Sequence, residues 1–282
     1  MNDREVSPRS YDRFRTFLEG ETGILLGESK QYLVRSRLVG LLHDYPELSL
    51  DGIIDLAIQG SDRMIRTRVI DAMTTNETLW FRDNYPFKLL EQTILPELAE
   101  HTSKLRIWSA ACSTGQEAYS IAMTVKEFQS QKPSAFKAGF EIIGTDISER
   151  VVKQAQLGEY NEMAILRGLP DHLQRKYFDR GPNNLLKVKQ ELARHTQFRT
   201  LNLLSSYSAL GKFDVIFCRN VLIYFSSDNK KHILQQIAAC LSPQGSLILG
   251  ASESATVVGD LFQMKKESNG LFYKRNLSPK VN

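Results

Sequence analysis

The sequence lacks several features that would assign it to particular classes of protein. Its three cysteines, Cys112, Cys218 and Cys240, form no pairing or metal-binding motif, which fits a reducing cytosol. A formal net charge of +4 with no long Lys/Arg block argues against nucleic-acid binding. No apolar run approaches the roughly 20 residues that span a bilayer, and the polar N-terminus lacks the apolar segment of a signal peptide. We therefore expect a cytoplasmic protein that does not insert into membranes.

Glycine is scarce at the one place where a common cofactor motif requires it. The segment RIWSAACSTGQEAYSIAM (Arg106 to Met123) has the pattern of a buried strand, a turn at Ala111 to Gly115 and a helix. A dinucleotide-binding turn has three glycines, and this turn has one. Glu117, just inside the helix, would repel a pyrophosphate and suits a hydroxyl or a cation. The turn therefore favours a positively charged cofactor, although an NAD-type oxidoreductase remains an alternative.

The 282 residues are enough for one large core and a smaller domain. Residues 1–75 show helical periodicity and no strand signal. Helix ends are predicted near Gly20, Pro46 and Gly60, and a last helix carries Met64, Ile65, Val69 and Met73. We interpret them as a helical subdomain, followed by a linker strap and helix over residues 76–100. Residues 101–282 alternate strand and helix patterns, which predicts an α/β fold with a Rossmann-like, mostly parallel sheet.

Two further β features are predicted in this part of the chain. The runs LFQMKKE and GLFYKRN flank Ser268-Asn269-Gly270, which is typical of a hairpin at the edge of a sheet. Residues 159–200 contain a short helix, PDHLQRKYF, and the alternating runs LLKVKQE and HTQFRTLN. We interpret this insertion as a small β-hairpin subdomain.

Polar side chains follow four of the predicted strands, where ligands bind in open parallel sheets. Besides Glu117, they are Asp146 after EIIGTD, the pair Asn202 and Leu203, and the pair Arg219 and Asn220 after FDVIFC. Asp146 could accept hydrogen bonds from ribose hydroxyls, cap the next helix, or do both. Arg219 and Asn220 suit a ligand site better than a core, with a surface loop as the alternative. Cys218 could be a nucleophile, but a small core residue is the favoured interpretation.

The segment TTNETLWFRDNYPF, Thr74 to Phe87, interleaves polar and aromatic residues outside the predicted sheet. It is either a capped linker with its aromatic side chains in the core or a strap whose polar side faces a cofactor.

Four blocks of this sequence together resemble the signature blocks of the chemotaxis receptor methyltransferases, the CheR family. They are AMTTNETLWFRD, RIWSAACSTGQEAYSIAM, FDVIFCRNVLIYF and LILGASE, in that order, after a helical preface. The resemblance extends from about Tyr11 to Arg275. It implies an S-adenosylmethionine-dependent protein-glutamate O-methyltransferase that forms glutamate methyl esters on chemoreceptors and leaves S-adenosylhomocysteine as product.

The resemblance also implies roles for individual residues. It places cofactor contacts on Asn76, Thr78, Arg82, Glu117, Asp146, Asn202, Leu203, Arg219 and Asn220. Arg82 and Tyr224 are the candidates to hold the substrate carboxylate, with plain packing as the alternative for Tyr224. No metal is expected. A non-catalytic adaptor with the same fold is a second alternative, although such an adaptor would be expected to have lost Asp146 or the Arg219 and Asn220 pair.

The expected partner is the cytoplasmic helical region of chemoreceptors, and the protein is expected to be a monomer. Residues 1–75 carry ten Lys/Arg and twelve Asp/Glu, a net charge of −2, where the family uses a basic face for docking. Arg35, Arg37, Arg66 and Arg68 are the candidate docking cations. The compact DRGPNNLLKV segment resembles the shorter hairpin of members that do not bind a C-terminal receptor tether.

Overall fold

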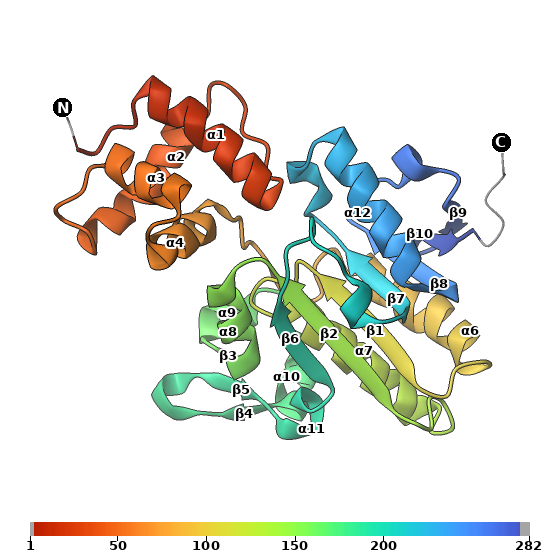
Figure 1. The fold of residues 1–282 in the computed structure, drawn as a ribbon. Coiled ribbons are helices and arrows are strands. Elements are labelled where there is room, and N and C mark those ends of the chain that lie inside the picture. Colours follow the sequence, from red (N-terminus) through yellow and green to blue (C-terminus); the bar gives the residue numbers. More distant parts are fainter. Residues whose placement is uncertain (1–2, 277–282) are drawn as a thin grey trace. The chain divides into compact units, whose positions relative to one another are not determined.

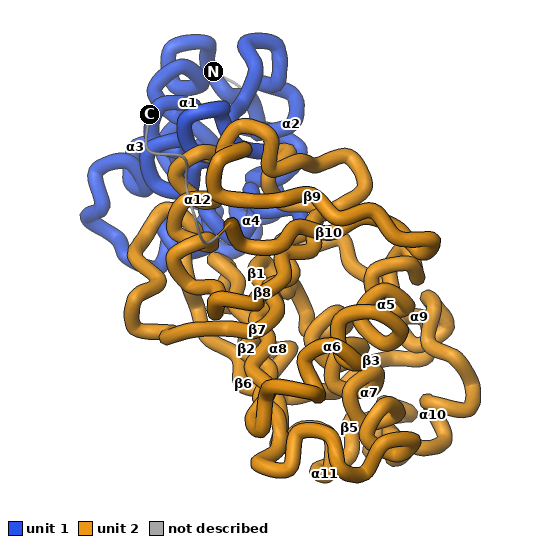
Figure 2. The backbone as a smooth tube through the Cα atoms, turned by 90° about the vertical axis from the view of Figure 1, so that its right-hand side faces the viewer, with its two compact units in different colours: residues 1–75, 224–229 blue, residues 76–223, 230–282 orange. Residues whose placement is uncertain are grey.

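The computed structural model describes residues 3–276. The contacts between residues divide the chain into two compact units, shown in Figure 2. The first contains residues 1–75 and 224–229, and the second contains residues 76–223 and 230–282. Among the described residues, no helix combines the length and the apolar character that crossing a membrane requires.

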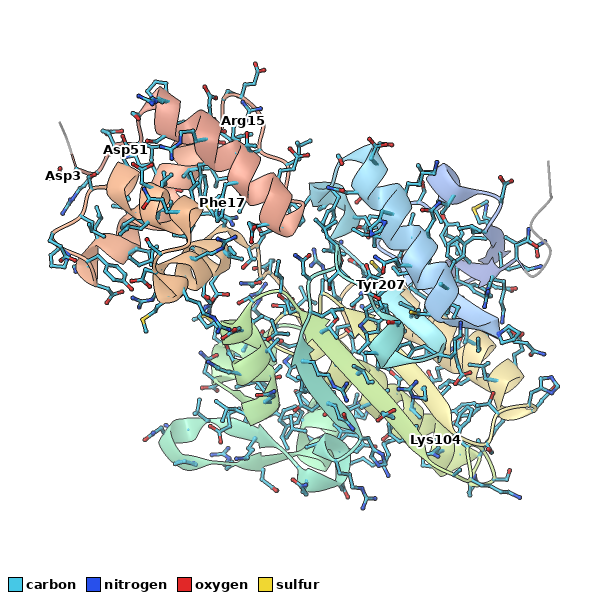
Figure 3. The ribbon with its side chains drawn as sticks, in the orientation of Figure 1. Asp3, Arg15, Phe17, Asp51, Lys104 and Tyr207 are labelled. Atoms are coloured by element: carbon cyan, nitrogen blue, oxygen red, sulfur yellow. The ribbon has the colours of Figure 1, made fainter. Side chains whose placement is uncertain are left out.

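The first unit is built from four α-helices, as the periodicity predicted. They are α1 (Pro8–Thr22), α2 (Gln31–Leu38), α3 (Leu50–Gln59) and α4 (Arg63–Met73), with a 3₁₀ turn at Val39–His43. The side chain of Ser7 caps α1, and the backbone N–H of Ser7 donates to Asp51, labelled in Figure 3, over 2.9 Å. This bond ties the start of α1 to the first turn of α3. Apolar side chains of all four helices form the core of this unit.

The first helix ends at Thr22, two residues beyond the glycine near which its end was predicted. The expected stop at Gly20 lies inside α1, and the helix continues to Thr22. Gly23 ends it in the left-handed conformation (φ 78°), and its N–H donates to the carbonyl of Glu19. A helix often ends where the residue that follows it has a positive φ, and glycine adopts this conformation most easily. When two glycines lie close together in the sequence, the second can therefore be the one that ends the helix. Gly60 (φ 69°) ends α3 in the same way, where it was expected.

The second unit contains a seven-stranded sheet in the order β6-β2-β1-β7-β8-β10-β9, which confirms the α/β prediction. The parallel strands are β1 (Leu105–Ala110), β2 (Phe140–Asp146), β6 (Thr196–Thr200), β7 (Phe213–Cys218) and β8 (Leu241–Leu249). The predicted C-terminal hairpin is present as β9 (Phe262–Glu267) and β10 (Gly270–Arg275), with β10 antiparallel to β8.

Helices cover both faces of this sheet (Figures 1 and 2). On one face lie α7 (Gln116–Gln131) and the helix that runs from α5 (Tyr85–Leu89) through a π turn (Leu90–Ile94) to α6 (Leu95–Ala99). On the other face lies α12 (Ser227–Cys240). Helix α8 (Glu149–Leu157) follows β2 in the chain. The strands between them are almost entirely buried, as the continuous apolar runs indicated.

The inserted segment differs from the predicted hairpin. It forms a three-stranded antiparallel sheet of β3 (Glu159–Tyr160), β5 (Leu186–Val188) and β4 (Phe178–Arg180), with α9 (Glu162–Leu166), α10 (Asp171–Tyr177) and α11 (Gln190–Ala193). The run HTQFRTLN is not part of it, because its strand β6 pairs in parallel with β2 at the edge of the main sheet. Alternation predicts a strand, but it does not say which sheet the strand joins.

Candidate functional site

The turn after β1 is held in an unusual conformation by the neighbouring strand. Ala111 (φ 62°), Ser113 (φ 50°) and Gly115 (φ 95°) all have a positive φ, which costs a residue other than glycine about 1 kcal/mol. The N–H of Ser113 donates to Oδ2 of Asp146 over 2.9 Å. The strained turn is therefore fixed to the carboxyl end of β2. Such strain is typical of a ligand site.

Gly115 has a packing role that the sequence did not reveal. A Cβ at this position would lie 2.9 Å from Cβ of Ala155 and 3.1 Å from the hydroxyl of Tyr160. The glycine thus lets α7 begin in close contact with α8.

Asp146 is buried at the end of β2 and organises two loops. Its Oδ1 accepts a hydrogen bond from the N–H of Ser148 (3.0 Å), while Oδ2 accepts the bond from Ser113. The cap of α8 is Ser148, whose hydroxyl accepts from Val151. The carboxylate of Asp146 therefore connects the turn after β1 to the start of α8.

A buried arginine joins the strap to the sheet. The side chain of Arg219 is 1% exposed, and its guanidinium pairs with Glu117 (2.9 Å) and Asp83 (2.7 Å). It also donates to the carbonyl of Arg82 over 3.0 Å. Glu117 accepts a further bond from the hydroxyl of Ser109 at 2.7 Å. Two carboxylates share one guanidinium, so the cluster keeps a net charge of −1.

One donor of this cluster is unused. The Nε–H of Arg219 is buried and has no hydrogen-bond partner among the described residues. Leaving a buried donor unpaired costs about 1–3 kcal/mol. This donor therefore points to an acceptor that a ligand would bring.

The segment Thr74 to Phe87 contacts both the core and the carboxyl edge of the sheet. Its aromatic part packs in the core: Trp80 is fully buried, and its indole N–H donates to the carbonyl of Ala164. Its polar part reaches the site, because the carbonyl of Asn76 accepts from the hydroxyl of Ser113 (2.9 Å) and Asp83 pairs with Arg219. Of the candidates in the strap, Thr78 is half-buried, and Arg82 is half-buried and donates to the carbonyl of Glu77 (3.0 Å).

The end of β6 joins the same edge of the sheet. The N–H of Leu201 donates to the carbonyl of Asp146 over 2.8 Å. Asn202 and Leu203 follow Leu201 directly, so they begin the loop next to the end of β2. Oδ1 of Asn202 accepts from the N–H of Leu204 (2.9 Å), and Leu203 is buried. In Figure 1 the parallel strands end at this common edge.

The structure thus gathers most of the candidates in the second unit, at the carboxyl ends of β1, β2, β6 and β7. Asn220 follows Arg219 there in the left-handed conformation (φ 57°). Tyr224 is different: it belongs to the segment 224–229 of the first unit, where its carbonyl accepts from the N–H of Leu25 over 2.9 Å.

Cys218 is a core residue, as favoured from the sequence. It is fully buried at the end of β7. Burial, and then the carboxylates of Glu253 and Glu117, raise the pKa of its thiol well above the usual value. Because the thiolate is the nucleophilic form, this environment argues against a catalytic cysteine.

Three residues that contribute to the site were missed from the sequence. Asp83 pairs with Arg219, Ser113 bonds both Asp146 and the strap, and Glu253 accepts from the N–H of Asn220. Asp83 and Glu253 each end one of the blocks AMTTNETLWFRD and LILGASE, and their place in these blocks was the available signal.

The chain is similar in sequence to known methyltransferases. Residues 76–271 match the family model described as CheR methyltransferase, SAM binding domain. Chemotaxis protein methyltransferase 1 of Vibrio cholerae is 47% identical over 269 residues, which cover 95% of this chain and 98% of that protein. Chemotaxis protein methyltransferase 1 of Pseudomonas aeruginosa is 48% identical over 267 residues, which cover 94% of this chain and 97% of that protein. The chemotaxis protein methyltransferase of Escherichia coli is 33% identical over 267 residues, which cover 93% of this chain and 90% of that protein.

Proposed function

We propose that this chain, which belongs to the CheR methyltransferase family, transfers a methyl group from S-adenosylmethionine to glutamate side chains of chemoreceptors. The family match identifies a methyltransferase that uses S-adenosylmethionine and gives no support to the NAD-type alternative. The receptor glutamates and the residue roles are our proposal. The observation that supports them best is the acidic cluster around Arg219 at the carboxyl edge of the sheet.

The residues at this edge fit S-adenosylmethionine chemically. The cofactor carries an ammonium and a sulfonium, and the cluster of Glu117, Asp83 and Arg219 has a net negative charge. The unused Nε–H of Arg219 suits the carboxylate of the cofactor's amino acid end. We assign the ribose hydroxyls to the carboxylate of Asp146, which lies at the carboxyl end of β2. We assign the remaining contacts to Asn76, Thr78, Arg82, Asn202, Leu203 and Asn220.

The reaction requires no general base from the chain. A glutamate carboxylate has an ordinary pKa of about 4.3 and is already ionised at neutral pH. When bound, the cofactor supplies an activated methyl group on a positively charged sulfur. The chain's residues therefore have to orient the carboxylate and exclude water from it.

Arg82 and Tyr224 are our candidates for orienting the carboxylate. Arg82 is half-buried in the strap, and the bond that its guanidinium makes is to a backbone carbonyl. Within residues 3–276 Arg82 forms no ion pair with a protein carboxylate, so its charge can meet the substrate. Tyr224 belongs to the first unit, and its role rests on the family resemblance and on a phenol that can donate a hydrogen bond.

We infer a cytoplasmic monomer that acts on the cytoplasmic helices of chemoreceptors without a tether peptide. The decisive experiment incubates the protein with radiolabelled S-adenosylmethionine and a panel of receptors from the same organism. Base-labile label on receptor glutamates is the expected result, and it should disappear when those glutamates are replaced by alanine. Binding of S-adenosylmethionine without transfer to any receptor would instead support the non-catalytic adaptor.

A further inference from the structure

The loop after β7 is attached to the end of β8 by a single carboxylate. Oε2 of Glu253 accepts from the N–H of Asn220 (2.8 Å) and from the N–H of Gly250 (2.8 Å). Oε1 accepts from the N–H of Val221 (2.9 Å) and from that of Ile223 (3.4 Å). One side chain thus satisfies four backbone donors from two loops. Converging N–H groups of this kind form an anion-binding nest, and here the protein's own glutamate fills it.

The glutamate is held at this place by the close approach of the two loops. A Cβ on Gly250 would lie 2.5 Å from Oε2 of Glu253 and 2.9 Å from the backbone nitrogen of Asn220. A side chain at position 250 would therefore push the carboxylate out of the nest. Asn220 also has a positive φ of 57°, which the bond from its N–H to Glu253 stabilises.

The loop that Glu253 holds carries residues of the proposed cofactor site. Asn220 is bonded directly, and Arg219 precedes it in the chain. The guanidinium of Arg219 must reach both Glu117 and Asp83 from this backbone position. Without the carboxylate, four N–H groups would lose their acceptor and the loop could relax away from this geometry.

We propose that Glu253 is a positioning residue, which fixes the backbone of Arg219 and Asn220 in the conformation that binds the cofactor. This inference rests on the proposed function, because it assumes that S-adenosylmethionine binds at this edge of the sheet. Glu253 acts through the loop and does not itself contact the cofactor or the reacting atoms.

The test compares cofactor binding by Glu253→Ala, Glu253→Gln and wild type, measured by calorimetry. The matched control is Glu127→Ala, which removes another carboxylate with two side-chain partners, Lys176 and Tyr177. Glu127 lies on α7, ten residues after Glu117 and so about 15 Å along the helix. Each protein is measured in sodium chloride and in sodium formate at equal ionic strength, because formate can occupy a vacated carboxylate site.

We expect both Glu253 variants to bind S-adenosylmethionine at least tenfold more weakly than wild type, and Glu127→Ala to stay within twofold. Formate should raise the affinity of Glu253→Ala for S-adenosylmethionine at least threefold above its value in chloride. It should have no effect on the affinity of Glu127→Ala. Affinity within twofold of wild type in Glu253→Ala, or a loss that formate does not reverse, would overturn the inference. It is also overturned if Glu253→Gln does not fold, since Glu253 is then needed for folding itself. Failure of the wild type to bind the cofactor would instead contradict the proposed function.

Discussion

Removal of the guanidinium of Arg219 tests the central contact of the site. In Arg219→Met the chain keeps much of its apolar length, but Glu117 and Asp83 lose their shared cation. The side chains of Arg219 and Glu117 are 1% and 13% exposed, so water cannot replace the lost partner at Glu117. Asp83 is 39% exposed and will be solvated instead. We therefore expect most of the cost to come from Glu117.

The magnitude follows from this difference in burial. Removing one partner of a buried ion pair costs about 3–5 kcal/mol, because a buried charge is left uncompensated. A surface pair such as that with Asp83 adds about 0–1 kcal/mol. In a domain of about 200 residues, 1 kcal/mol lowers the melting temperature by about 2–4 °C. Arg219→Met should therefore cost about 3–6 kcal/mol in total and lower the melting temperature of the second unit by about 6–24 °C.

A double-mutant cycle separates the ion pair from other effects of the substitution. Glu117→Gln removes the charge and keeps an oxygen for the hydroxyl of Ser109. We expect the double variant with Arg219→Met to be more stable than the sum of the single effects, by about 1–3 kcal/mol. The assay is urea denaturation followed by circular dichroism. Additive effects, or a cost below 1 kcal/mol for Arg219→Met, would refute the argument that the buried pair stabilises the site.

Three further predictions test the individual assignments. Asp146→Asn should weaken binding of S-adenosylmethionine by about 10-fold or more in calorimetry, because a charge-assisted bond is worth about 1.5–3 kcal/mol; unchanged affinity with the fold intact would leave Asp146 a loop-organising residue only. Arg82→Ala should lower kcat at saturating cofactor and receptor while the melting temperature changes by about 1 °C or less; normal turnover would make Arg82 a linker residue. Burial lowers the pKa of His195, which stacks on Phe140, so the neutral form is favoured in the fold. The stabilising contribution of neutral His195 is present above the ordinary pKa of about 6.5 and is lost as the pH falls through the lower pKa of the folded state. His195→Gln should therefore lose less stability than wild type between pH 7 and 5. Equal losses in thermal melts would contradict this.

The elements that local pattern determines could be predicted from the sequence. The strands β1, β2 and β7 are short continuous apolar runs, and the helices around them carry one apolar face, so their positions followed from periodicity. The hairpin of β9 and β10 followed from its turn residues. Asn202 was expected to follow a strand of the main sheet, but the neighbour of β6 in that sheet could not be predicted, since its pairing with β2 is set by packing between segments about 50 residues apart.

For the candidate site too, the sequence indicated the types of residue but not the partners with which they interact. The residue types after the strands indicated a cationic ligand, and Glu117 does lie in a cluster of net negative charge. The sequence did not indicate that Glu117 already has a buried cationic partner in Arg219, which comes from 102 residues further along the chain. The strain at Ala111 and Ser113 was also hidden, because neither residue type is a signal for a positive φ.

The arginines of the helical unit show what a count of charges omits. Composition offered Arg35, Arg37, Arg66 and Arg68 as docking cations, and each has an internal partner in the structure. Arg35, Arg66 and Arg68 pair with Glu5, Glu21 and Asp44, and Arg37 donates to the carbonyls of Met73 and Thr74 and to the hydroxyl of Thr75. A receptor that used the first three would have to compete with acidic residues of this same unit, so the net gain per contact would be small. Arg37 has a different role, because it satisfies carbonyls at the C-terminal end of α4, where a helix leaves its last acceptors unpaired and a cation is favoured. Its replacement would therefore disturb the chain immediately before Asn76 and Thr78, and a loss of methylation in such a variant would not by itself demonstrate receptor docking.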